Sequence, residues 1–439
     1  MIKLAAKLES VSAEKVYEKN GISFFHIKSD KFKTVRIDVF FIEPLNREKA
    51  ASNAIIPFVL KRGSKNYPDQ QKLAMRLEEL YGAGLSADVM KKGENQIIHF
   101  SADFVSDQYT AGKTKLFDEI GSLVIDIITK PALENGTFNN NYFEQEKGNL
   151  IQRIKSRVND KIHYSMLRCM EEMCKDEPFA VYEDGDEESA KALTREKVYE
   201  DYTALLCESP VYVYISGNVS DYEIKTFVDK FDSIQRNNIR NIIVPQVKKE
   251  ITEVKRIEEP MDISQGKLCL GFRTQTEANS PDYYPLAVYN GILGGGVQSK
   301  LFQNVREKES MAYFAFSRLE KFKGLMVVCS GIDISNREKA EKVINEQLAA
   351  IKNGDISDFE MDATKKTFET GLKSMQDSQG AMVDFFLSQH ISNINESIDT
   401  FLERLLEVGK QEVVRIAERI TPDTVYFLTS LSEENSQMR

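Results

Sequence analysis

The sequence has no tryptophan, only four histidines and only five cysteines among 439 residues. The cysteines are odd in number, lie far apart and form no Cys-x-x-Cys pair, which argues against a disulfide framework and predicts reduced thiols that pack in the core. They are Cys169, Cys174, Cys207, Cys269 and Cys329. No stretch approaches the roughly 18 uninterrupted apolar residues of a membrane-spanning helix, so we expect no membrane span.

Glycine and proline are also scarce, at 23 and 11 residues, and 41% of the residues are hydrophobic, so the chain is globular rather than disordered. Asp and Glu, at 68, outnumber Lys and Arg, at 58, and the formal net charge is −10. This charge excludes a nucleic-acid partner bound by bulk electrostatics. Residues 1–10 lack the apolar core of a secretory signal, so we expect a cytoplasmic protein.

Hydrophobic periodicity predicts alternating strands and helices in the first half of the chain. The run from Val35 to Ile42 alternates with a period of two, as in a half-buried strand. Leu73, Leu77 and Leu80 share one face of a helix that begins near Asp69. The further expected elements, in order, are a hairpin with arms 85–90 and 96–104, helices over 116–127, from 142 and after 194, and a strand over 211–217.

The second half repeats this order of elements. Phe143 corresponds to Phe359 at an offset of 216 residues, and Val211 to Val425 at an offset of 214. We interpret the repeat as an internal duplication. It predicts an α+β protein with two homologous halves, 1–235 and 266–439, joined by a polar linker over 236–265, in which helices pack on one face of a mostly antiparallel sheet. The expected elements of the second half are a strand over 268–272, a helix ending in a glycine loop at 296, a hairpin around 321–324 and helices over 340–351 and 361–375.

The histidines offer no local metal motif. They are His26, His99, His163 and His390, and no two are spaced as a ligand pair. His163, Cys169 and Cys174 come nearest to a cluster, but these positions do not share one helix face. Thiols of this kind are usually buried packing residues, which is the interpretation that we favour.

A glycine run over 294–296 lacks the Gly-Lys-Ser/Thr ending of a phosphate loop and follows no strand, so it indicates a hinge or a helix terminus rather than a nucleotide site. Ser299, Arg306 and Tyr313 follow this run. On spacing alone, an arginine and a tyrosine seven residues apart favour an ordinary helix-to-strand junction.

These features together resemble the insulinase, or pitrilysin, family of zinc peptidases, also called inverzincins. The resemblance rests on the duplicated halves, on the run from Gly294 to Tyr313 and on the stretch Leu60-Lys61-Arg62-Gly63-Ser64, and it extends from about residue 18 to residue 431. It implies two insulinase-like α/β halves that form a clam-shaped chamber.

The family binds zinc through a His-x-x-Glu-His motif, and a glutamate on a later long helix completes the site. The matching positions are Ala54, Pro57 and Phe58 and, for the later glutamate, Arg153. None of these side chains ligates Zn²⁺ or activates water, and a cation at Arg153 opposes a metal. Glu146 matches a neighbouring acidic position, but a single carboxylate does not complete a zinc site. The resemblance therefore implies a degenerate zinc motif, with no metal site and no catalytic residue in this chain.

Arg306 and Tyr313 match a substrate motif of the family that is intact here. In the family, this pair hydrogen-bonds the peptide backbone and polarises the carbonyl that is attacked. The resemblance implies a catalytically incomplete subunit of a heterodimeric peptidase, whose homologous partner carries the zinc and cuts an extended peptide substrate. The other expected substrate-binding residues are Gly294, Gly295, Gly296 and Ser299.

Two other functions compete with this one. A non-enzymatic peptide-binding or assembly scaffold would keep the duplicated fold for assembly, with Arg306 and Tyr313 as residual features. A neighbouring gene for a homologue with intact His-x-x-Glu-His would favour the peptidase subunit, and its absence would favour the scaffold. A lone peptidase with another nucleophile lacks any supporting spacing of Ser, His and Asp.

Overall fold

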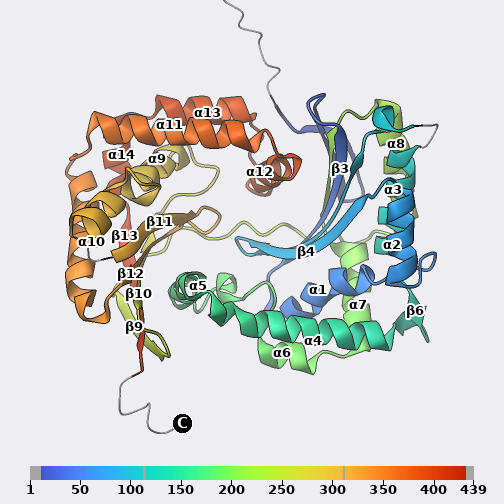
Figure 1. Cartoon of the computed structure of the whole chain (residues 1–439), viewed down its shortest axis with the longest axis horizontal. Coiled ribbons are helices and arrows are strands. Elements are labelled where there is room, and N and C mark those ends of the chain that lie inside the picture. Colours follow the sequence, from blue (N-terminus) through green and yellow to red (C-terminus); the bar gives the residue numbers. More distant parts are fainter. Residues whose placement is uncertain (1–10, 112–114, 310–311, 432–439) are drawn as a thin grey trace, which may run out of the picture. The chain divides into compact units, whose positions relative to one another are not determined.

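The computed structural model describes residues 11–111, 115–309 and 312–431. Within these ranges the chain divides into two compact units. Unit 1 comprises the described residues of Met1–Ile154, Tyr182–Ile243 and Ser374–Phe401. Unit 2 comprises those of Lys155–Val181, Val244–Lys373 and Leu402–Arg439. The ribbon in Figure 1 follows the chain through both units.

Unit 1 is built on a six-stranded sheet with the order β1-β2-β8-β3-β5-β4. β3 is antiparallel to β5 and β8, whereas β2 and β8 are parallel. Val35, Ile37 and Val39 join the hydrophobic core on one face of this sheet, as their alternation predicts. The strands are β1 (Glu14–Lys19), β2 (Ile22–Lys28), β3 (Thr34–Pro44), β4 (Gly84–Lys92), β5 (Asn95–Val105) and β8 (Val211–Gly217).

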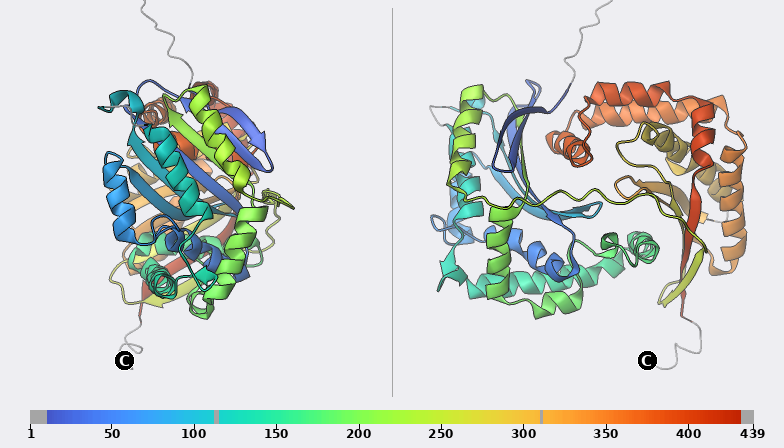
Figure 2. Two further views of the ribbon diagram at one scale, coloured as in Figure 1. Left: turned by 90° about the vertical axis from the view of Figure 1, so that its right-hand side faces the viewer. Right: turned by 180° about the vertical axis from the view of Figure 1, so that it is seen from behind.

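Helices cover that face of the unit 1 sheet. Figure 2 (left) shows α3 (Leu116–Thr129) and α8 (Asp221–Lys230) lying side by side across the strands. Ile120 and Phe227 bring these two helices into the same core as the strands. The other helices with residues in unit 1 are α1 (Arg47–Leu60), α2 (Gln70–Glu79), α4 (Asn140–Ser156), α6 (Glu187–Ala192), α7 (Arg195–Glu208) and α12 (Gln379–Ile391), and a small ribbon joins β6 (Leu133–Glu134) to β7 (Thr137–Phe138).

Unit 2 is built on a five-stranded sheet with the order β11-β12-β10-β13-β9. Its strands are β9 (Lys255–Met261), β10 (Gly266–Arg273), β11 (Ala312–Glu320), β12 (Leu325–Ile332) and β13 (Thr421–Ser430). Its helices are α5 (Lys161–Met173), α9 (Tyr283–Gly294), α10 (Arg337–Lys352), α11 (Asp358–Met375), α13 (Ile398–Glu407) and α14 (Lys410–Ala417), of which α11 and α13 also reach into the ranges of unit 1.

The two sheets have the same topology, which confirms two homologous α+β halves. β2-β8-β3-β5-β4 in unit 1 matches β9-β13-β10-β12-β11 in unit 2. In both sheets the first of these pairs is parallel and the other three are antiparallel. β1 is the strand that unit 1 has in addition.

The compact units differ from the expected halves 1–235 and 266–439, because each half contributes a segment to the other unit. Residues 155–181, with α5, belong to unit 2, and residues 374–401, with α12, belong to unit 1. The expected linker over 236–265 also contains β9, which pairs in parallel with β13. β9 is an edge strand of mostly exposed charged residues, so its hydrophobic alternation is weak.

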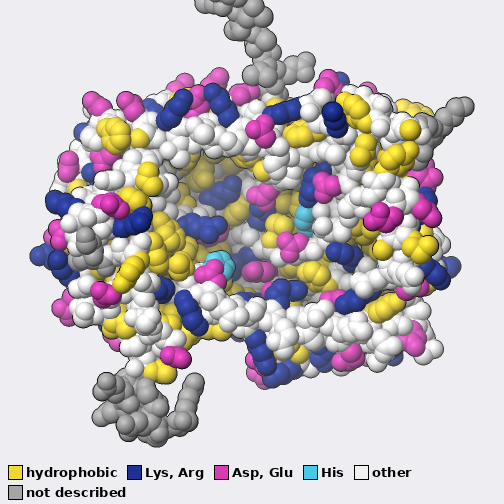
Figure 3. All heavy atoms as spheres, in the orientation of Figure 1, with side chains coloured by type: hydrophobic (Ala, Val, Ile, Leu, Met, Phe, Trp, Pro, Cys, Tyr) yellow, Lys and Arg dark blue, Asp and Glu magenta, His cyan; other side chains and the backbone are white. Residues whose placement is uncertain are grey.

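None of the helices formed by the described residues is both long and apolar enough to cross a membrane. On the face drawn in Figure 3, Lys and Arg side chains are interspersed with Asp and Glu over both units.

Candidate functional site

The positions that match the zinc motif lie on α1, in unit 1. The helix begins at an Asn46 cap, whose side chain accepts a hydrogen bond from the backbone N–H of Glu48. Ala54 and Pro57 are buried in the core side of the helix, and Phe58 is partly buried. Pro57 lies in the last turn, where it removes a backbone donor near the helix end at Leu60.

Arg153 on α4 contacts Phe58 directly. Its guanidinium lies over the Phe58 ring, 4.5 Å from the ring centroid. The same guanidinium donates to one carboxylate oxygen of Asp184, with distances of 3.1 Å from Nε and 2.9 Å from Nη2. Two of the four positions that match zinc-site residues are therefore occupied by a stacked, ion-paired arginine and an aromatic ring. A cation in this place repels Zn²⁺ and offers it no lone pair.

The neighbouring carboxylate of Glu146 is also engaged. It pairs with Arg62, which follows α1, and accepts a hydrogen bond of 3.1 Å from the Asn149 amide. Only 8% of Glu146 is exposed. Across the described residues, no group of three or more His, Cys, Asp or Glu side chains is arranged to hold a metal ion.

Arg306 and Tyr313 lie in unit 2, on either side of residues 310–311, which are outside the described ranges. Arg306 is on a π-helical segment, η5 (Leu301–Lys308), and Tyr313 is in β11, which packs against η5. Their side chains are accessible, with 43% of the Arg306 side chain and 62% of Tyr313 exposed. Because β11 is the last strand of its sheet, the pair stands at a sheet edge.

The contacts of this pair are weak. The Arg306 guanidinium lies 4.6 Å from the Phe302 ring centroid, and its Nε is 3.6 Å from a carboxylate oxygen of Glu307. The Tyr313 hydroxyl donates to Asp333 at 3.4 Å. A surface pair at these distances contributes little to stability, so both donors can turn to a ligand at small cost.

The glycine loop before η5 has a structural reason for at least one glycine. A Cβ at Gly294 would come within 2.3 Å of the backbone nitrogen of Ser317 in β11, so only glycine permits this close approach. Ser299 is 1% exposed, and its hydroxyl donates to the Gly296 carbonyl oxygen at 2.6 Å. In this structure, Ser299 therefore holds the loop in shape. Gly295 lies beside Gly291 of α9.

An ion pair fixes the residue that follows Ser299. Lys300 Nζ lies 2.9 Å from a carboxylate oxygen of Glu360 on α11, and Lys300 is 7% exposed. Burial alone would raise the pKa of Glu360, but hydrogen bonds from the Ser357 backbone and from Lys300 lower it. The start of η5 is thus anchored to α11, and the exposed Arg306 extends from an anchored segment.

Sequence reasoning missed Asp184 and the Arg62–Glu146 pair. Asp184 lies 31 positions from Arg153, in a loop with no motif of its own. The only signal available was a charge that needs a partner: an arginine next to a buried apolar helix implies a nearby carboxylate without indicating which one.

Comparisons with known proteins identify the family. The family model described as "Peptidase M16 inactive domain" matches residues 192–368. A protein of Bacillus subtilis described as probable inactive metalloprotease YmfF is 35% identical over 408 residues, which cover 93% of this chain and 96% of that protein. The uncharacterized zinc protease YmxG of the same organism is 24% identical over 336 residues, with coverages of 75% and 80%.

A solved structure of a conserved protein from Enterococcus faecalis superposes with a TM-score of 0.89 at 29% identity, covering 96% of this chain and 99% of that one. The fold and the relatives agree with one another. The chain is an inactive metalloprotease homologue and belongs to the M16, or insulinase, family of peptidases.

Proposed function

We propose that the chain is a catalytically incomplete subunit that pairs with a zinc-bearing homologue and uses Arg306 and Tyr313 to hold an extended peptide at the partner's metal. The observation that carries this proposal is the contrast between the two sets of residues. Arg153 is tied to Phe58 and Asp184, whereas Arg306 and Tyr313 are exposed donors with weak contacts.

The chemistry of the exposed pair suits this role. A peptide carbonyl that is attacked by water gains negative charge, and a guanidinium and a phenol can both donate hydrogen bonds to it. The edge of β11 supplies backbone groups to which an extended peptide can add as a further strand. Gly294 to Gly296 and Ser299 shape the loop that leads to Arg306.

The metal has to come from another chain. Zinc catalysis requires ligands and an activated water, and the four matching positions here are Ala54, Pro57, Phe58 and Arg153. A zinc protease among the relatives supports the existence of suitable partners in this family.

The test begins with co-purification of the chain from its native organism, followed by mass spectrometry and reconstitution with any zinc-bearing homologue that is recovered. In the reconstituted complex, Arg306→Ala or Tyr313→Phe should lower peptide turnover on the order of 10² to 10³-fold and leave complex formation unchanged. Arg306→Lys should rescue poorly, because a point charge does not reproduce the planar guanidinium.

Matched controls keep this test specific. Lys342→Ala removes an exposed charge on α10, and Tyr222→Phe removes an exposed hydroxyl on α8, and both should leave turnover unchanged. A loss of melting temperature or of assembly with Arg306→Ala, at unchanged turnover of the remaining complex, would instead support a scaffold. Recovery of no zinc-bearing partner would also favour the scaffold.

A further inference from the structure

A pocket of about 480 Å³ opens in unit 1, away from α1 and α4. Its walls come from the ends of three strands, β2, β3 and β5, from the segments that follow β5 and β8, and from the starts of two helices, α3 and α8. Its volume lies within the ~300–1,000 Å³ of small-molecule sites. The lining residues are His26, Lys28, Val35, Phe104, Ser106, Asp107, Gln108, Phe117, Asn218, Val219, Ser220, Asp221 and Glu223.

One turn shapes the floor of this pocket. β8 ends at Gly217, whose φ of +129° suits glycine and turns the chain toward Asn218 and α8. His26, 6% exposed, bonds through Nε2 to the Gly217 carbonyl oxygen at 3.0 Å. Burial lowers the pKa of His26, against the opposing effect of this hydrogen bond, in which Nε2–H donates to the carbonyl oxygen.

Some polar groups in the pocket already satisfy each other. Ser220 and Glu223 form a capping box at the start of α8, in which Glu223 accepts from the Ser220 backbone at 2.9 Å. Asp107 accepts a 3.3 Å hydrogen bond from the Phe117 backbone nitrogen. Burial raises the pKa of Asp107 in spite of that bond, as expected for a partly buried carboxylate without a cation beside it.

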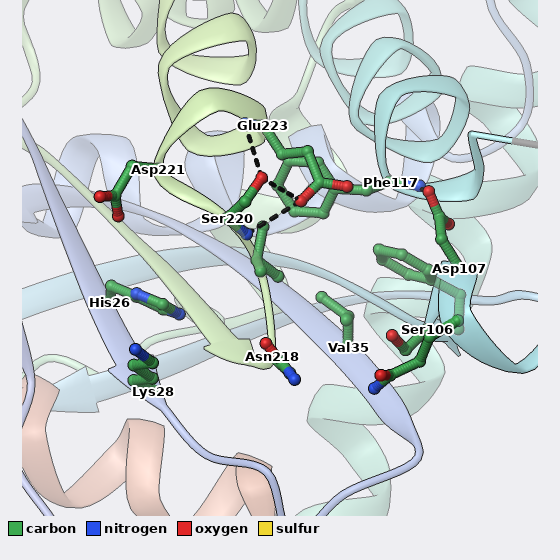
Figure 4. A pocket seen from close by; sticks show the side chains of 13 residues that line it. His26, Lys28, Val35, Ser106, Asp107, Phe117, Asn218, Ser220, Asp221 and Glu223 are labelled. Carbon is green, nitrogen blue, oxygen red and sulfur yellow. Dashed lines mark hydrogen bonds between the residues drawn. The ribbon is translucent and has the colours of Figure 1, made fainter.

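Other polar groups are unused. Ser106 is 4% exposed and lines the pocket, yet no residue that the structure describes makes a hydrogen bond to its hydroxyl. Within the described part of the chain, Lys28 and Asp221 likewise make no ion pair. Figure 4 shows Lys28 on one side of the pocket and Asp107 on the other, with Asn218 between them. Lys28 and Asp107 therefore place opposite charges on opposite sides of the pocket, with Asp221 on the side of Lys28 and Ser106 on the side of Asp107.

We propose that this pocket binds a short peptide of two or three residues with both termini free, its carboxylate toward Lys28 and its ammonium toward Asp107. Ser106 and Asn218 hydrogen-bond the peptide group between the termini, and Val35 and Phe117 form the apolar wall beside its side chains. A ligand of a single charge would leave one wall unpaired, which disfavours a simple anion or cation. The inference is independent of a zinc-bearing partner.

The test is calorimetric titration of the full chain with dialanine, its N-acetyl form, its amide and the doubly capped form. Dialanine should bind saturably, and each single cap should weaken binding at least ~10-fold, the equivalent of ~1.4 kcal/mol. Lys28→Gln should abolish the preference for a free carboxylate and leave the preference for a free ammonium intact. Asp107→Asn, which keeps an acceptor for the Phe117 backbone, should abolish the preference for a free ammonium only.

Lys225→Gln and Asp229→Asn serve as matched controls, because both change exposed charges on α8 outside the pocket. They should leave both preferences intact. Equal binding of dialanine and its doubly capped form would overturn the proposal. So would a Lys28→Gln variant, folded by circular dichroism, that keeps the carboxylate preference, or the lack of saturable dialanine binding at ~10 mM, far above the range of a specific site.

Discussion

The two units share a strand order, but one contact of each exchanged segment differs sharply in its chemistry. In unit 2, Glu177 follows α5 and receives three cations: Lys249 at 2.6 Å, Arg273 at 2.9 Å and Lys323 at 2.7 Å. In unit 1, His390 of α12 stacks on Phe25 with ring centroids 4.1 Å apart. It also shares a 2.6 Å hydrogen bond with the Tyr214 hydroxyl. The Glu177 anchor is ionic and the His390 anchor is neutral and aromatic, although α12 also carries an ion pair, between Asp384 and Lys92 at 2.6 Å.

The same contrast separates the two candidate sites. In unit 1, Arg153 is satisfied by Phe58 and Asp184, so its charge stabilises the fold and is not available to a ligand. In unit 2, Arg306 and Tyr313 are exposed and weakly held. Equivalent architecture therefore does not imply equivalent chemistry, and each site has to be judged by what its side chains already bind.

The largest expected effect comes from the ionic anchor. Glu177→Gln leaves Arg273, 0% exposed, and Lys323, 1% exposed, with too little negative charge, which typically costs ~3–5 kcal/mol. Hydrogen–deuterium exchange should show loss of protection in α5 and β10. Glu341→Gln, which breaks a pair with Arg256, whose side chain is 57% exposed, is the control and should cost ~1 kcal/mol or less. Equal effects of the two variants would mean that the Glu177 cluster contributes no more than the control pair.

The two anchors should also fail in different pH ranges. Burial lowers the pKa of His390 from 6.5 to about 4, so the unfolded chain takes up its proton first and stability falls between these values as the pH drops. Burial would raise the pKa of Glu177, but hydrogen bonds from Lys249, Lys323 and Arg273 lower it from 4.5 to about 2. Its contribution is complete above pH 4.5 and is lost below it.

Hydrogen–deuterium exchange at several pH values, corrected for the intrinsic exchange rates of the amides, separates the two pH ranges. The free energy of opening of α12, derived from its exchange protection, should decrease by no more than ~3 kcal/mol between pH 6.5 and pH 4.5. The protection of α5 should decrease only below pH 4.5. His390→Phe keeps the stack with Phe25 and should remove the pH dependence of α12 in the upper range. Loss of α5 protection at a higher pH than loss of α12 protection would contradict the assignment of these pH ranges to Glu177 and His390.

Smaller effects on stability are expected from one substitution at each of the two candidate sites. Asp184→Ala leaves a partly buried Arg153 without this carboxylate and should lower the free energy of unfolding by ~1–3 kcal/mol. Asp333→Ala removes only the 3.4 Å contact to Tyr313 and should change the free energy of unfolding by less than ~0.5 kcal/mol. Thermal melting of both variants decides this point, and equal destabilisation would mean that Tyr313 is held as firmly as Arg153.

Local patterns predicted much of the fold. β8 spans Val211–Gly217, and β3 extends the expected run by one residue before and two after, because alternation reports a half-buried strand directly. α3 likewise begins at Leu116, as its apolar stripe indicates. The duplication was readable because Phe143 and Val211 recur with nearly the same offset.

The placement of segments that pack far from their own half could not be predicted from the sequence. Nothing in α5 or α12 indicates that each packs in the other unit, because their apolar faces fit any sheet of suitable size. The replaced zinc positions were identified by register, but the stack of Arg153 on Phe58 joins residues 95 positions apart and depends on the fold. The burial of Ser299 was hidden for a similar reason, since a serine after glycines is equally typical of an exposed loop.

We propose that this chain lacks a metal site and depends on a partner for zinc. Elemental analysis of the purified chain, with peptide cleavage measured on the same sample, tests it most directly. The account predicts far less than one zinc per chain and no cleavage, also for the variant Ala54→His, Pro57→Glu, Phe58→His, in which Arg153 still occupies the third ligand position. About one zinc per chain, lost on chelation together with peptide cleavage, would contradict it.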